Sequence, residues 1–161
     1  MHRLYCEEKD INYGQKYLLD LCDKRQLNQF WQKNCLDQFD FTYIFCIATG
    51  KQKSASLAFI NLLSRFINPA DWFYTLSEPK PQELPDNVRL TDNIRLSKNF
   101  SFIQKMYENK ELYSFCKEKN ISYKALMHVL TGRNLISYPK IKELKEIFKP
   151  IDWFILDENN L

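Results

Sequence analysis

The sequence predicts an all-α chain that contains two copies of one small helical unit. A Thr-Gly pair, a polar loop, an apolar stretch and the motif Pro-x-Asp-Trp-Phe follow one another twice, in residues 49–73 and 131–154. Within each copy the apolar residues recur at spacings of three and four, which is the period of an amphipathic helix. No stretch alternates apolar and polar residues for long enough to predict a strand. A separation of about 82 residues is too long for a solenoid repeat and favours two copies of one domain.

The first copy is expected to hold four helices within residues 1–76. Apolar residues at helical spacing place these helices at 13–25, 27–34, 41–48 and from about 57 to 67. Asp40 is a good N-cap for the third helix, and Gly50 suits the left-handed residue that follows a helix. Ser54 or Ser56 is expected to cap the fourth helix.

Residues 77–97 are expected to form a linker, because three prolines lie there among charged and polar residues, at positions 79, 81 and 85. Proline removes a hydrogen-bond donor from a helix and stiffens an extended chain. The second copy then occupies residues 98–161, with helices expected at 100–107, 112–119, 123–130 and 138–148. Asn120 is expected at the turn before the third of these helices, since Asn tolerates the left-handed conformation. Trp72 and Trp153 are expected to be buried anchors that close the two copies.

Composition excludes several functional classes. The five cysteines are scattered without a CxxC pair and the chain has two histidines, so we expect no metal site. No Ser/His/Asp set and no phosphate-binding glycine loop occurs, so we expect neither an enzyme nor a cofactor. We expect no secretory leader, because no apolar run follows the first residues, and the sequence has no apolar run of about 18 residues. We therefore expect a cytoplasmic protein with no membrane partner.

Residues 121–134 resemble a known family. Their sequence, ISYKALMHVLTGRN, is followed by Ser137, a helix pattern and a closing Ile-Asp-Trp-Phe at 151–154. In the order and spacing of these residues the stretch resembles the Cro/cI-type (XRE-like) helix-turn-helix family of phage and bacterial repressors. A weaker resemblance covers about residues 13–73. The resemblance implies two divergent, tandem helix-turn-helix units of the lambda-repressor kind, joined by the proline-rich linker.

The resemblance also implies that the third helix of the second copy enters the major groove of DNA, with its N-terminal half facing the base edges. Lys124 would donate to guanine O6 or N7, and His128 would donate to a base acceptor. Ser122 and Arg133 would lie near phosphates, which position the protein without reading the sequence. The complete set implied at the interface is Ser122, Tyr123, Lys124, His128, Arg133 and Asn134.

Basic residues concentrate in the second copy, where a surface that faces phosphates would need them. Residues 117–149 contain eight Lys or Arg and three acidic residues, a balance of +5. The matching residues 32–68 contain four basic and two acidic residues, a balance of +2. An alternative stays open for Lys140, Lys142 and Lys145, because Lys alternating with Glu is also typical of an ordinary solvated helix face.

The third helix of the first copy differs in character. Phe41, Thr42 and Cys46 stand where the second copy has Tyr123, Lys124 and His128, so no basic side chain is offered to DNA. One interpretation is that Phe41 and Phe45 form an interaction surface for the other copy, a second subunit or another protein. The alternative is that both side chains simply belong to the core.

The sequence thus predicts a sequence-specific DNA-binding transcriptional regulator whose second unit reads double-stranded DNA. We expect it to act as a homodimer, because repressor-like proteins bind half-sites related by two-fold symmetry. The alternative is a protein–protein interaction module that keeps the helix-turn-helix fold without binding DNA, since fold alone does not imply function.

Overall fold

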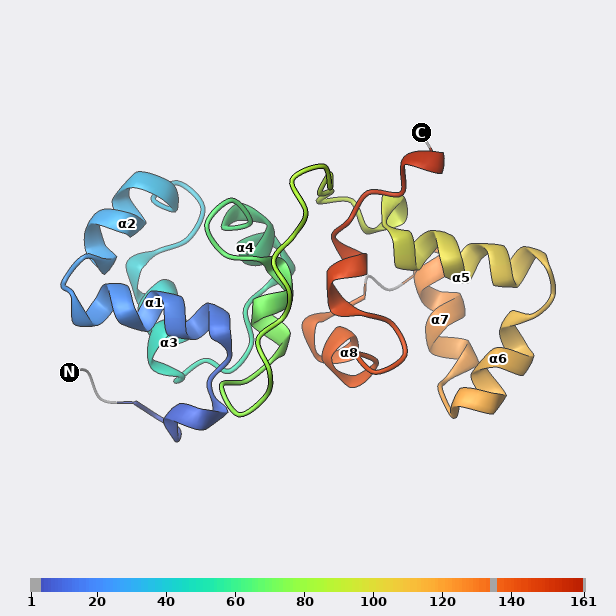
Figure 1. Cartoon of the computed structure of the whole chain (residues 1–161), viewed down its shortest axis with the longest axis horizontal. Helices are drawn as coiled ribbons and strands as arrows, with labels where there is room; N and C mark the ends of the chain where they lie inside the picture. Colours follow the sequence, from blue (N-terminus) through green and yellow to red (C-terminus); the bar gives the residue numbers. More distant parts are fainter. Residues whose placement is uncertain (1–3, 134–135, 161) are drawn as a thin grey trace. The chain divides into compact units, whose positions relative to one another are not determined.

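The chain divides into two compact units, Met1–Leu84 (unit 1) and Pro85–Leu161 (unit 2), in a computed structural model that describes residues 4–133 and 136–160 (Figure 1). The described residues form eight α-helices and several short 3-10 helices. Their β-pairing is limited to three isolated bridges, so the fold class is all-α, as the sequence predicts. No helix within the described ranges is long and apolar enough to cross a membrane.

Unit 1 consists of four successive α-helices and a 3-10 turn. These are α1 (Tyr13–Asp23), α2 (Leu27–Asn34), α3 (Phe41–Thr49), α4 (Leu57–Leu62) and the turn Pro69–Phe73. Side-chain oxygens cap three of the helices at their N-termini, with Asn12 before α1, Asp40 before α3 and Ser56 before α4. Gly50 ends α3 with φ at 79°, a conformation that glycine adopts without steric cost.

Unit 2 repeats this order. Its elements are α5 (Lys98–Glu108), α6 (Leu112–Lys119), α7 (Tyr123–Leu130), α8 (Tyr138–Glu143) and the turn Pro150–Trp153. The predicted bounds of α6 and α7 are confirmed, but the predictions of one continuous helix from about 57 to 67 and over 138–148 are wrong, because α4 ends at Leu62 and α8 ends at Glu143. After Glu143 the chain tightens, and the Ile147 N–H donates to the Leu144 carbonyl at 2.9 Å, three residues back. Phe148 nevertheless reaches the core, because this tight turn keeps the apolar face inward.

Each unit contains the same backbone pairing. The residues just before its first helix pair with the residues just after its Trp-Phe turn. In unit 1 an isolated bridge pairs Asn12 with Thr75, and in unit 2 an isolated bridge pairs Ser97 with Leu156. Backbone hydrogen bonds of 2.8–3.1 Å flank each bridge at corresponding residues. Each unit is therefore closed upon itself by its own backbone.

Trp72 and Trp153 are buried anchors, as predicted, each with a relative exposure of 0%. The Trp72 ring meets Phe59 of α4 edge to face, with 5.8 Å between ring centroids. The same indole lies directly over Gly14 in α1. In unit 2 the Trp153 ring meets Phe148 in the same way, at 6.1 Å. Such aromatic pairs add to the large apolar area that a buried indole removes from water.

The proline-rich segment 77–97 is bonded to both units rather than hanging free along its whole length. On the side of unit 1, the Tyr13 hydroxyl donates to the Glu78 carbonyl, and the Asn68 side-chain amide donates to the Gln82 carbonyl at 3.0 Å. On the side of unit 2, the Thr91 N–H donates to the Phe154 carbonyl at 2.7 Å. The division between the two units falls between Leu84 and Pro85.

The substitution Gly14→Ala tests how closely α1 packs against the Trp72 indole. A Gly→Ala change in an open helix position stabilises by about 0.5–1 kcal/mol. In Gly14→Ala, however, the added Cβ would lie 2.4 Å from Cδ2 of the Trp72 indole. We therefore expect a loss of about 1–3 kcal/mol in the free energy of unfolding, measured by urea denaturation with circular dichroism, because overpacking displaces the ring.

The control for this change is Asn28→Ala, at an exposed position of α2. Its effect should stay within about 0.5 kcal/mol, as is usual for surface substitutions. A Gly14→Ala protein at least as stable as the unchanged chain would contradict the close packing of the indole on α1.

Candidate nucleic-acid interface

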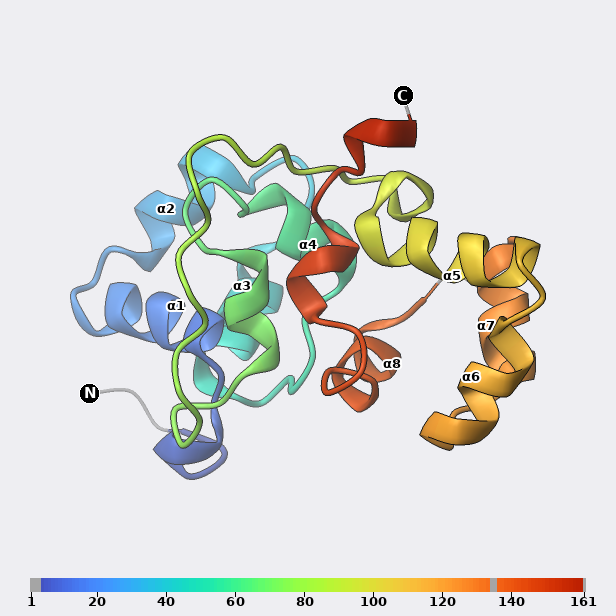
Figure 2. The same ribbon diagram turned by 45° about the vertical axis from the view of Figure 1, so that its right-hand side comes forward.

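α7 leaves most of its side chains at least partly accessible. Leu126 is its single buried residue, and the other seven residues of this fully described helix are half-buried or exposed. α7 packs beside α5 and α6 within unit 2 (Figure 2). By contrast α3, at the corresponding place in unit 1, buries Ile44, Ile47, Ala48 and Thr49. The two third helices therefore differ in how much of their surface is available to a partner.

Local signals in the sequence set where α7 begins. Asn120 ends α6 in the left-handed conformation at φ 56°, which Asn adopts more easily than most residues. Three residues separate α6 from α7, and the last of them is Ser122. The Ser122 hydroxyl accepts a hydrogen bond from the Ala125 N–H at 3.1 Å, which satisfies one of the free amides of the first turn. In unit 1 the corresponding connection, from Cys35 to Asp40, is longer.

A shallow hollow of about 400 Å³ lies along the exposed side of α7. Its walls carry the positive charges of Lys124 and Arg133, both exposed, next to the half-buried His128 ring. Tyr123 forms one edge and packs edge to face against Tyr113 of α6, with ring centroids 5.4 Å apart. Cationic donors beside an aromatic edge suit a polyanion that also presents flat bases.

The structure brings together four of the six residues expected at the interface, namely Tyr123, Lys124, His128 and Arg133. Ser122 stands next to them as the N-cap of α7. Its hydroxyl oxygen accepts the capping bond, so its own hydrogen remains available to a further acceptor. Asn134 lies outside the described residues.

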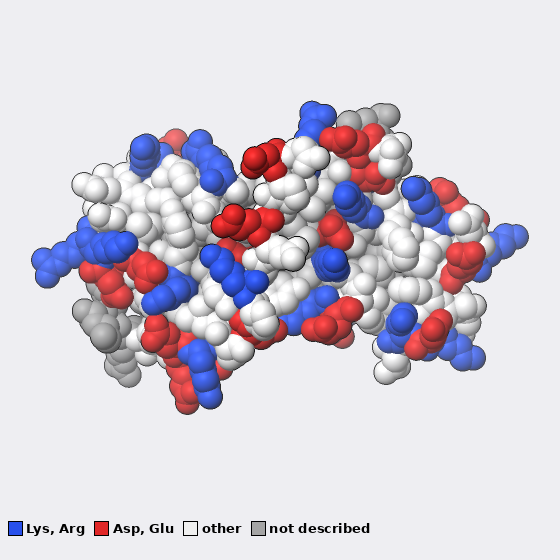
Figure 3. Space-filling model, viewed as in Figure 1, with Lys and Arg blue, Asp and Glu red and all other residues white. Residues whose placement is uncertain are grey.

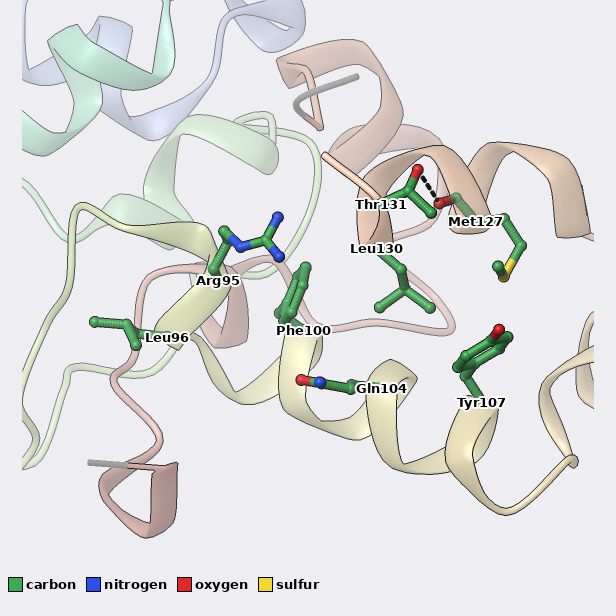
Figure 4. Close-up of a pocket in the computed structure, with 8 residues that line it drawn as sticks. All are labelled: Arg95, Leu96, Phe100, Gln104, Tyr107, Met127, Leu130 and Thr131. Atoms are coloured by element: carbon green, nitrogen blue, oxygen red, sulfur yellow. Dashed lines mark hydrogen bonds between the residues drawn. The ribbon is translucent and has the colours of Figure 1, made fainter. Parts of the chain in front are cut away.

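Sequence reasoning missed two residues that line the hollow, Met127 and Thr131. The Thr131 hydroxyl donates to the Met127 carbonyl at 2.9 Å, so it is bound to the helix backbone (Figure 4). A signal for both was present, because residues 123, 127 and 131 follow the four-residue spacing of one helix face. Tyr113, which supports Tyr123, has no such signal because it comes from another helix.

Charge outside the hollow is mixed. Lys117 and Lys119 are exposed at the end of α6, close in sequence to α7. Lys140 forms an ion pair with Glu143 at 2.9 Å, as expected for an ordinary helix face. On the face of the molecule drawn in Figure 3, Lys and Arg are interspersed with Asp and Glu over both units. On this face, therefore, the basic residues form no continuous positive field.

The side chains of Phe41 and Phe45 on α3 are half-buried. The Phe41 ring meets Trp31 of α2 edge to face at 5.8 Å and stacks on Phe45 at 6.1 Å between centroids. The two rings thus take part in the aromatic packing of unit 1 and also keep an exposed side. The packed side of each ring agrees with a place in the core, and the accessible side leaves an interaction surface possible, so the two alternatives both stay open.

No protein-family model, curated protein or solved structure shows significant similarity to this chain. Inference about the candidate interface therefore depends on its own residues and geometry.

Removing the cap of α7 should loosen the whole candidate interface. We expect Ser122→Ala to cost about 1 kcal/mol in the free energy of unfolding of unit 2, because an N–H of the first turn loses its acceptor. Ser137→Ala is the matched control, since Ser137 is the N-cap of α8 but makes no side-chain capping bond. Amide hydrogen exchange resolved by residue measures both. Equal losses for the two substitutions would contradict the structural role of the Ser122 hydroxyl.

Proposed function

We propose that this protein is a sequence-specific DNA-binding transcriptional regulator in which the α6–α7 pair of unit 2 acts as a helix-turn-helix. The observation that carries the proposal is the hollow on α7, where Lys124, His128 and Arg133 stand together around a helix that buries only Leu126. A recognition helix has to be held by few core contacts on one side and display donors on the other. We also propose that the protein acts in the cytoplasm, because a regulator of this kind needs access to DNA.

In this proposal the N-terminal half of α7 enters the major groove of double-stranded DNA. Lys124 lies in the first turn of the helix and is exposed, so its ammonium group can donate to guanine O6 or N7. His128 is one turn further on and faces the same hollow, where a ring N–H can donate to a base acceptor. The Ser122 hydroxyl and the Arg133 guanidinium flank the helix ends and bind phosphates, which set the register on the duplex.

Unit 1 takes a different role in this proposal. Its Asp40 carboxylate caps α3 at the position of Ser122 and would repel a phosphate there. The half-exposed rings of Phe41 and Phe45 favour association with protein instead, and we propose that unit 1 supports a homodimer that binds two half-sites. The same rings favour a second candidate function, a protein–protein interaction module that retains the fold without reading DNA.

Two substitutions separate base reading from phosphate binding. A duplex selected from a random-sequence pool by the unchanged chain serves as the target. We expect Lys124→Ala to weaken binding to it by about 1–3 kcal/mol and to relax the selected sequence, because a base contact is lost. We expect Arg133→Ala to weaken binding to all duplexes and to lower the slope of log K against log salt by about 1. Fluorescence anisotropy over a salt series measures both effects.

The control for these substitutions is Lys24→Ala, which removes an exposed charge from unit 1. It should change neither the selected sequence nor the salt slope. Failure of the pool to enrich any sequence would exclude sequence-specific reading, and Lys124→Ala binding as tightly as the control would exclude α7 as the reader. Either result would favour the interaction module.

Sedimentation of the intact chain tests the role of unit 1. We expect a dimer at tens of micromolar and a shift to monomer in Phe41→Glu, because a charge at this place opposes burial of the patch. Circular dichroism should first show that the variant keeps its helices, since Phe41 also contacts Trp31. An unchanged chain that sediments as a monomer at this concentration would rule out the dimer.

A further inference from the structure

Arg95 places a positive charge beside the C-terminal end of α7. It lies in the 3-10 turn Ile94–Leu96, just before α5. Its guanidinium stands over the Phe100 ring, 5.2 Å from the ring centroid (Figure 4). Its Nη1 atom would lie 3.2 Å from a Cβ at Gly132, the residue that follows the C-cap Thr131 of α7. Within unit 2, Arg95 therefore connects the start of α5 to the end of α7.

The Arg95 side chain is held in place, but its hydrogen-bond donors are unused. The Arg95 N–H donates to the Asn93 side chain at 3.1 Å, which fixes the backbone from which the side chain extends. Within residues 4–133 and 136–160, the exposed guanidinium forms neither an ion pair nor a hydrogen bond. A guanidinium offers five N–H donors in a planar fork that matches a phosphate. Because the ring and the turn already restrain this group, it loses little freedom when it binds an anion.

The corresponding place in unit 1 shows that packing does not require a charge here. Gly50 ends α3 as Gly132 follows α7, and both glycines have positive φ, at 79° and 77°. In unit 1 neutral side chains lie over the glycine. The Cys6 sulfur would be 2.8 Å and the Ile11 Cγ2 3.6 Å from a Cβ at Gly50. The fold can therefore cover this glycine with neutral groups, and the charge of Arg95 is an additional property of the unit that carries the candidate interface.

Arg95 adjoins the hollow on the outer side of α7. Gly132 stands between Thr131 and Arg133, which both line the hollow. Met127 and Thr131 line the hollow and also an open groove between α5 and α7, and Arg95 lines the same groove. The Arg95 guanidinium therefore extends the cationic set of the candidate interface beyond the C-terminal end of α7. Phosphates border the major groove on both sides, so a cation beyond the end of a recognition helix is suited to the DNA backbone.

We propose that Arg95 binds a phosphate of the DNA backbone, in addition to the contacts made by α7. This inference rests on the proposed function, because it requires that α7 of unit 2 meets DNA. Arg95 contributes affinity and register rather than base reading, since contacts to phosphate carry no sequence information directly. Its planar fork can donate two parallel hydrogen bonds to one phosphate, which an ammonium group cannot do with the same geometry.

Arg95→Gln tests the proposal, because it removes the charge and keeps a polar side chain. The probes are the duplex selected from the random-sequence pool by the unchanged chain and an unrelated duplex, in fluorescence anisotropy over a salt series. We expect binding to both duplexes to weaken about tenfold at low salt. The slope of log K against log salt should fall by about 1, and the selected sequence should stay unchanged.

Arg95→Lys gives a second reading that does not depend on how Arg95→Gln folds. It keeps the charge, so the salt slope should stay as it is in the unchanged chain. Binding should weaken about threefold, because the planar fork is lost. Urea denaturation of each variant identifies the temperature at which unit 2 is folded, and binding is compared there.

Arg89→Gln is the matched control, because Arg89 is an exposed arginine of unit 2 that lines neither the hollow nor the groove. It should keep both affinity and slope. Equal slopes for Arg95→Gln and Arg89→Gln would overturn the role of Arg95, even where Lys124→Ala relaxes the selected sequence. An unchanged slope with a relaxed sequence in Arg95→Gln would also overturn it, because Arg95 would then act through the placement of α7.

Failure of the proposed function gives a different result. A pool that enriches no sequence, together with a lower slope in Arg95→Gln, would support the phosphate contact and exclude sequence-specific reading. An unchanged chain that binds no duplex at low salt would overturn both the phosphate contact and the proposed function.

Discussion

Burial of the Trp-Phe turn against the first helix is the constraint on which each unit depends. In unit 1 the Trp72 indole lies on the backbone of α1 at Gly14, and it also holds α4 through Phe59. Because the turn is fixed beneath α1, the chain that follows it runs beside the chain that precedes α1, and the bridge between Asn12 and Thr75 can form. The third helix then packs on α1, so the position of any surface that it displays follows from the anchor.

The two units meet this constraint with different side chains. Where unit 1 has Gly14 and close backbone contact, unit 2 has Asn99 at the corresponding position of α5. The buried Asn99 side chain donates to the Lys149 carbonyl at 2.9 Å, just before the Pro150–Trp153 turn. A hydrogen bond across the contact thus replaces direct packing on a glycine, and each arrangement leaves no bulky group between helix and turn. The same backbone arrangement therefore accepts either Gly or Asn at this position of the first helix, provided that the residue keeps the Trp-Phe turn attached to the helix.

Helices with local start and stop signals were predictable from the sequence, because those signals act within one turn. Asp40, Gly50 and Ser122 set the bounds of α3 and α7 in this way. The end of α8 was not predictable, since the apolar pattern continues through a tighter turn with the same inward face. The hollow on α7 was predictable in part, from residues on one helix. The open groove between α5 and α7, lined by Phe100, Tyr107 and Leu130, was not predictable, because its walls come from two helices that are distant in the sequence.

The difference between α3 and α7 is the physical reason for our proposal that unit 2, and not unit 1, recognises DNA. α3 buries four of its nine residues, and its aromatic rings also interlock with Trp31, so most substitutions on it would disturb the core of unit 1. α7 has Leu126 as its single buried residue and depends for the rest on its cap and on partial contacts with α5 and α6. Large losses of stability come from changes to buried groups, whereas exposed positions accept change at little cost. A helix held by few buried contacts can present a selective set of donors without altering the fold. Of the third helices of the two units, α7 is the one held in this way.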